Sequence, residues 1–87
     1  HQAVEVAKAV IALEEAEDKL EDAKRQYKDY KRNLSDLERQ LDQLEQDVKN
    51  KVPGVSADDL VELRALVEDV KGDEEFMQAG VALAAVN

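Results

Sequence analysis

Five basic side chains and two tyrosines alternate within residues 24–32, the segment of this 87-residue chain best suited to bind a charged ligand. Lysine and arginine can neutralise phosphates and tyrosine rings can stack on bases, so the segment could contact nucleic acid. The basic residues form a possible contact face: Lys24, Arg25, Lys28, Lys31 and Arg32. The periodicity described below places both tyrosines in an apolar seam instead. We therefore expect a solvated face, or a docking site for an acidic protein, ahead of nucleic-acid binding.

Clustered carboxylates are the other candidates for chemistry. The acidic residues at 58–59 and 73–75 could hold a hard cation, but neither cluster has the spacing of a calcium loop, and both stand where helices are expected to begin. The chain has no cysteine and one histidine, His1, which excludes a Cys/His zinc site and a Ser/His/acid triad. Its three glycines are isolated, so no phosphate-binding loop exists. The sequence predicts no enzyme, no metal and no cofactor.

Composition limits the class of protein. Charged residues make up 38% of the chain and aromatic residues 3%, a profile typical of long helices. The formal net charge is −9, and residues 56–87 are the acidic part with 2 basic and 8 acidic side chains. This acidic third would be repelled by nucleic acid and by anionic lipid. The apolar stretches are too short to span a membrane, so a soluble, cytoplasmic protein is the default expectation.

Apolar residues recur every three or four positions through the first half of the chain. Residues 3–51 contain neither glycine nor proline, so one helix can run through them. A strict seven-residue repeat over about six heptads is typical of a left-handed coiled coil. A Ser-x-x-Glu box at Ser35 could start a new helix, but the repeat keeps its phase there and favours one continuous helix. The predicted oligomerisation seam consists of Val6, Leu13, Leu20, Tyr27, Tyr30, Leu34, Leu37, Leu41, Leu44 and Val48.

The second half begins with a turn. Pro53 and Gly54 fit the centre of a type II turn, and Ser56 with Asp59 can cap a following helix at roughly 57–71. Gly72 can end that helix, and Asp73 can cap a third helix that opens with Glu74 and Glu75 and continues through the apolar segment 76–86. The sequence therefore predicts an all-α fold in one structural domain. Residues 1–52 form a long heptad-repeat helix, and residues 53–87 form a Pro-Gly turn and two short helices that pack back on it as a helical hairpin or small bundle.

Helix lengths indicate that one chain cannot cover its own apolar surface. At 1.5 Å per residue the first helix is about 70 Å long, whereas the two shorter helices reach about 45 Å even end to end. They could cover the first helix down to about residue 20 and would leave the apolar segment 3–13 bare. Phe76 and Met77 could be core or a binding hot spot. The possible partner-binding residues are Val4, Val10, Ile11, Phe76, Met77 and Leu83.

These features predict a non-catalytic protein that self-associates and serves as a structural, scaffolding or adaptor module, in contact with itself and another protein. An antiparallel pairing centred between Leu34 and Ser35 sets Lys31 against Glu38, so we favour antiparallel chains, although the chain's own hairpin could satisfy part of this pattern. The alternative is a small acidic inhibitor or decoy that binds a basic protein surface. Nucleic-acid binding through the basic face is the third hypothesis.

Overall fold

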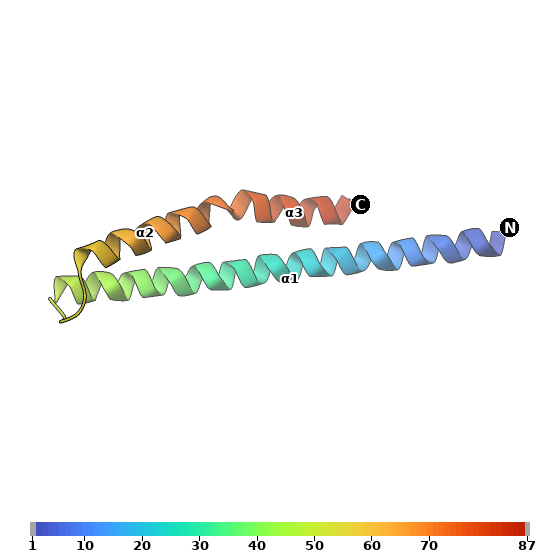
Figure 1. Ribbon diagram of the computed structural model, residues 1–87. Helices are drawn as coiled ribbons and strands as arrows, with labels where there is room; N and C mark the ends of the chain where they lie inside the picture. The colour runs from blue at the N-terminus through green and yellow to red at the C-terminus, as the bar shows by residue number, and fades with distance from the viewer. Residues whose placement is uncertain (1, 87) are drawn as a thin grey trace.

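The computed structural model describes residues 2–86 as three helices, α1 (Gln2–Lys49), α2 (Ala57–Gly72) and α3 (Glu74–Val86). α2 and α3 follow one another back along α1, so the molecule is a hairpin of one long helix and one bent arm (Figure 1). No strand occurs within these residues. The predicted all-α fold, with a long helix, a Pro-Gly turn and two shorter helices, is confirmed. His1 and Asn87 lie outside the described residues.

α1 is one unbroken helix of 48 residues, so the capping box at Ser35 starts no new helix. The helix ends at Lys49, three residues before the predicted boundary, in a hydrogen-bonding pattern that reuses its last carbonyls. The N–H of Val52 donates to the carbonyl of Asp47 at 3.0 Å, and the N–H of Lys51 donates to that of Val48 at 3.2 Å. Lys51 has a φ of 55°, the left-handed conformation that this Schellman pattern requires. A side-chain-bearing residue thus occupies a position that favours glycine.

The connection to α2 follows the predicted turn chemistry. Gly54 has a φ of 85°, as the third residue of a type II turn requires, and the N–H of Val55 donates to the carbonyl of Val52 at 3.4 Å. Ser56 then caps α2. Its hydroxyl accepts from the N–H of Asp59 at 3.4 Å, and the carboxylate of Asp59 accepts from the N–H of Ser56 at 3.2 Å. This reciprocal capping box satisfies two backbone donors and fixes where α2 begins.

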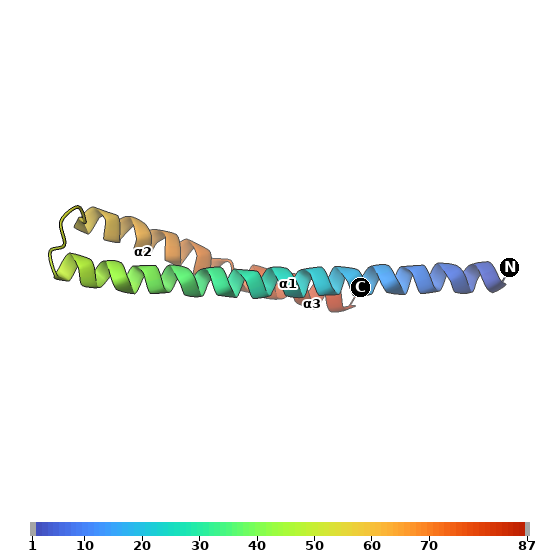
Figure 2. The same ribbon diagram turned by 90° about the horizontal axis from the view of Figure 1, so that it is seen from below.

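α2 and α3 are separated by a bend at Asp73 and not by a reversal. The N–H of Asp73 donates to the carbonyl of Val70 at 3.2 Å, and the N–H of Met77 already donates to the carbonyl of Asp73 at 2.9 Å. Helical hydrogen bonding therefore resumes almost at once. Seen from below, the bent arm crosses from one side of α1 to the other, so α2 and α3 contact different faces along its length (Figure 2).

The contact between α1 and the bent arm formed by α2 and α3 follows heptad spacing. The half-buried apolar positions of α1 are Ala16, Leu20, Ala23, Tyr27, Tyr30, Leu34, Leu37, Leu41, Leu44 and Val48. Opposite them lie Leu60, Leu63, Val67, Val70, Glu74, Met77, Val81 and Ala84, again in steps of three and four that continue across the bend. Most of the predicted oligomerisation seam is therefore covered by the same chain. The antiparallel pairing centred at residues 34–35 would require this hairpin to open.

The core of the single chain is small. Val67, which is 1% exposed, is the one fully buried side chain among residues 2–86. The molecule measures 74 × 17 × 13 Å, and its radius of gyration is 21.1 Å. A compact domain of this length would have a radius of gyration of about 12 Å. Two helices in contact along one stripe leave every other face in solvent, so the hairpin buries little apolar surface.

Candidate interaction surface

The first three turns of α1 extend beyond the end of α3 (Figure 1). We call residues 2–13 the N-terminal arm. Its large apolar side chains are all about half exposed or more: Val4 51%, Val6 62%, Val10 49%, Ile11 55% and Leu13 60%. Glu5 and Lys8 are its only charged residues. An apolar helical segment of this kind, uncovered on several sides, is the usual mark of a protein-binding surface.

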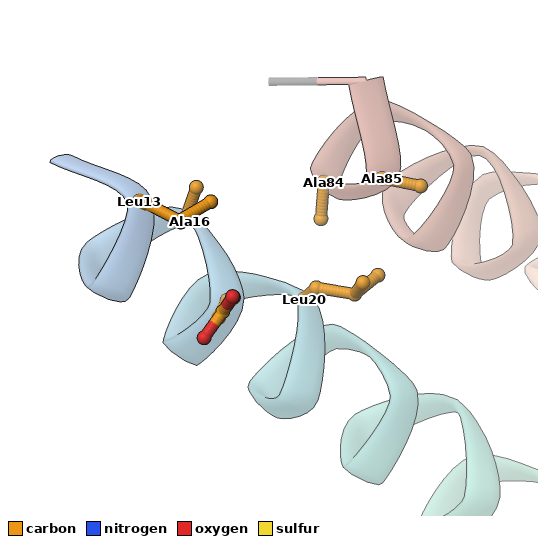
Figure 3. A pocket seen from close by; sticks show the side chains of 6 residues that line it. Leu13, Ala16, Leu20, Ala84 and Ala85 are labelled. Atoms are coloured by element: carbon orange, nitrogen blue, oxygen red, sulfur yellow. The ribbon is translucent and has the colours of Figure 1, made fainter. Parts of the chain in front are cut away.

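A shallow apolar notch marks the point where α3 stops covering α1. It has a volume of about 210 Å³ and is lined by Leu13, Ala16, Glu17, Leu20, Ala84 and Ala85. Figure 3 shows Ala84 of α3 pointing toward α1, where Leu13 and Leu20 lie across a gap. Cavities that bind small molecules usually measure about 300–1,000 Å³ and enclose their ligand. The notch is smaller and open to solvent, and it suits an aliphatic side chain of another helix.

α3 carries a second apolar stripe that faces away from α1. Its inner side, Met77, Val81 and Ala84, is half-buried in the hairpin. The outer stripe consists of Phe76, Ala79, Leu83 and Val86. Phe76 is 78% exposed, Leu83 61% and Val86 80%. Of the possible partner-binding residues in α3, Phe76 and Leu83 are thus on the surface, whereas Met77 is half-buried in the contact between α3 and α1.

A polar cluster joins α1 to the bend between α2 and α3. The hydroxyl of Tyr27 donates to Glu74 Oε1 at 3.2 Å and accepts from Gln78 Nε2 at 2.9 Å. The hydroxyl of Tyr30 donates to the carbonyl oxygen of Val70. The two rings stack with their centroids 6.3 Å apart. Glu74 replaces an apolar residue in the heptad spacing, and the hydrogen bond that it accepts from Tyr27 helps to set the register between α3 and α1.

These contacts change the ionisation of one tyrosine. The pKa of the Tyr30 hydroxyl is raised above its ordinary value of 10.0. The largest cause is partial burial, and the nearby carboxylates of Glu74 and Asp73 and the hydroxyl of Tyr27 add to it. Both the apolar surroundings and the negative charges disfavour a phenolate. Tyr30 is therefore held as a neutral hydrogen-bond donor to the backbone of α2.

The basic contact face is exposed, and much of it is already engaged. Arg25 pairs with Asp22 at 3.3 Å, and Arg32 pairs with Asp29 at 2.9 Å. Lys31 Nζ lies 4.6 Å from the centroid of the Tyr27 ring. The remaining two residues of the face, Lys24 and Lys28, are exposed as well. Because the tyrosines pack against α2 and α3, their rings are half-buried and only partly accessible for stacking on bases.

Within residues 2–86, no three carboxylate or imidazole side chains gather closely enough to hold a metal ion. No helix in this part of the chain combines the length and the apolar composition of a membrane span. No family model, curated protein or solved structure matches the chain.

Two features of this surface were not predicted from the sequence. The heptad spacing that begins at Leu60 continues through Glu74 to Ala84, and a charged residue in phase with the apolar ones concealed it. The positions of the small residues Ala79, Ala84 and Ala85 could not be predicted from sequence, because alanine is common on every face of a helix. Counting the three- and four-residue steps across the bend would have separated the inner from the outer side of α3.

Proposed function

We propose that this chain is a non-catalytic helical module that self-associates and serves a structural, scaffolding or adaptor role. The observation that carries the proposal is the N-terminal arm, an apolar stretch of three helical turns that the rest of residues 2–86 leaves uncovered. Burial of a large aliphatic side chain contributes about 1.5–3 kcal/mol. Burial of several such side chains on one helix would therefore contribute favourably to the free energy of binding a second helix.

The total surface supports the same proposal. The chain exposes 6908 Å². A compact monomer of the same mass, 9.7 kDa, would expose about 5,100 Å². The excess is roughly 1,800 Å², and a standard protein–protein interface takes about 800 Å² from each partner. The chain thus has more surplus surface than a stable dimer needs.

Sedimentation equilibrium over a dilution series tests the proposal. We expect a dimer or higher oligomer at micromolar concentration that dissociates on dilution. Ile11→Asp places a charge on the arm and should weaken association by about tenfold or more, because each factor of ten corresponds to about 1.4 kcal/mol. Gln46→Asp adds the same charge to an exposed position of α1 beside α2 and is the matched control. A wild-type chain that stays monomeric throughout the series would refute self-association.

A second candidate function rests on the acidic outer surface of α2. Glu62, Glu68 and Asp69 are exposed there, and no ion pair occupies them within the described residues. Such a surface suits an inhibitor or decoy that occupies a basic protein surface. Affinity of that kind falls steeply with salt, whereas association through the apolar arm changes little. A salt titration of partner binding therefore separates the two functions.

A further inference from the structure

The N-terminal arm and the outer stripe of α3 match one another in spacing. In the arm, Val6, Val10 and Leu13 are separated by four and three residues. In the outer stripe, Ala79, Leu83 and Val86 are separated by the same steps. Both sets are exposed in the hairpin. Side by side and in parallel, the two helices would place Val6 by Ala79, Val10 by Leu83 and Leu13 by Val86.

Charge does not oppose this contact. Residues 76–86 contain no charged side chain, and the arm contains one of each sign, Glu5 and Lys8. Phe76 would lie beside the first turn of the arm, where its ring could be covered. Both surfaces are three helical turns long. The match therefore extends over the whole outer stripe and has no unpaired charge within it.

The contact cannot form within one chain. α3 lies along the middle of its own α1, as the hydrogen bond from Tyr27 to Glu74 and the packing of Ala84 near Ala16 show. The arm continues straight past the end of α3 (Figure 1). Because α1 is one unbroken helix, the arm cannot fold back to reach Leu83 of the same chain. A second copy must supply the arm.

We propose that two copies of this chain form an antiparallel, two-fold symmetric dimer in which each N-terminal arm lies on the outer stripe of the other copy's α3. α3 runs antiparallel to its own α1, so an arm parallel to the partner's α3 makes the two long helices antiparallel. A two-fold axis at the level of Leu13, beside the notch, brings both arms onto both stripes at once. Each half of the dimer is then a three-helix bundle completed by the other chain.

This inference rests on the proposed self-association and names the surfaces that carry it. The chain has no cysteine, so single cysteines can test the contact directly. Val10→Cys and Leu83→Cys, made separately with different affinity tags, are mixed and oxidised with copper phenanthroline in air. Both native residues are exposed, at 49% and 61%, so neither change removes core packing from the hairpin. We expect a disulfide-linked heterodimer well in excess of either homodimer.

The controls decide between arrangements. Val61→Cys carries an equally exposed cysteine, at a 62% exposed site on α2, and should link to Leu83→Cys at background level. If wild-type protein sediments as a dimer but Val10→Cys forms mainly disulfide-linked homodimers, the N-terminal arms of the two copies pair with each other and our arrangement is wrong. If it sediments as a dimer and neither residue 10 nor residue 83 forms links, both surfaces are excluded from the interface. A monomeric wild type would instead overturn the proposed function itself.

Discussion

Val67→Ala is the substitution that tests most directly how the hairpin is held together. Val67 is 1% exposed and lies on α2 against the α1 seam. The change removes two methyl groups at about 0.8 kcal/mol each and leaves a cavity, a loss of roughly 1.5–2.5 kcal/mol. The higher helix propensity of alanine returns about 0.5 kcal/mol. We therefore expect a net destabilisation of about 1–2 kcal/mol.

Thermal unfolding followed by circular dichroism, at one fixed protein concentration, measures this effect. For a chain of this size each kcal/mol shifts Tm by about 4–8 °C, so Val67→Ala should lower it by roughly 4–16 °C. Val61→Ala is the matched control, the same change in the same helix at a position 62% exposed. Its Tm should stay level or rise slightly. Equal shifts in the two variants would show that α2 does not pack on α1 through Val67.

Three further predictions concern the helix ends and the tyrosine cluster. Lys51→Gly should raise the free energy of unfolding by about 1 kcal/mol, because glycine adopts the observed φ of 55° without strain. Lys49→Gly, inside the helix, should lower the free energy of unfolding by about the same amount. Urea denaturation measures both changes. Ser56→Ala should cost about 1 kcal/mol in the same assay through loss of the cap on α2, and Ser56→Asp should restore most of it. Burial raises the pKa of Tyr30, so its contribution is fully present below pH 10.0 and is lost as the pH rises through the raised value. Tyr30→Phe should therefore lose stability less steeply than the wild type in melts above pH 10.0, and parallel curves would contradict this assignment.

The heptad repeat of α1 can pair with helices of the same chain or with helices of another chain, and different parts of α1 are available for each. From Ala16 to Val48 the repeat is covered by α2 and α3, which a short turn holds nearby. Intramolecular pairing of this kind has a high effective concentration, so it precedes pairing between chains. From Val6 to Leu13 the repeat is exposed, and no other segment of residues 2–86 covers it. We therefore expect the proposed self-association through the repeat to involve the N-terminal arm.

Local chemistry in the sequence was enough to predict the elements. The absence of glycine and proline through residues 3–51 predicts the long helix, and Pro53 with Gly54 predicts its reversal. Ser56 and Asp59 predict where α2 begins, because a capping box depends only on residues three apart. The uncovered segment at the start of the chain also followed from sequence, since helix length is proportional to residue number. The helix boundaries thus depend on residues near in sequence, and the uncovered segment depends only on helix length.

The tertiary structure decided which apolar stripes are covered within the chain and which stay exposed. The sequence assigns Leu20 through Val48 equally well to a seam between chains or within one, because a heptad repeat does not identify the helix opposite it. The bend at Asp73 could also have reversed the chain, and its backbone geometry carries α3 onward to reach Ala16. That direction separates the inner side of α3 from the exposed stripe at Phe76 and Leu83. Which face of a helix is left exposed depends on the packing of segments distant in sequence, and no local pattern contains that information.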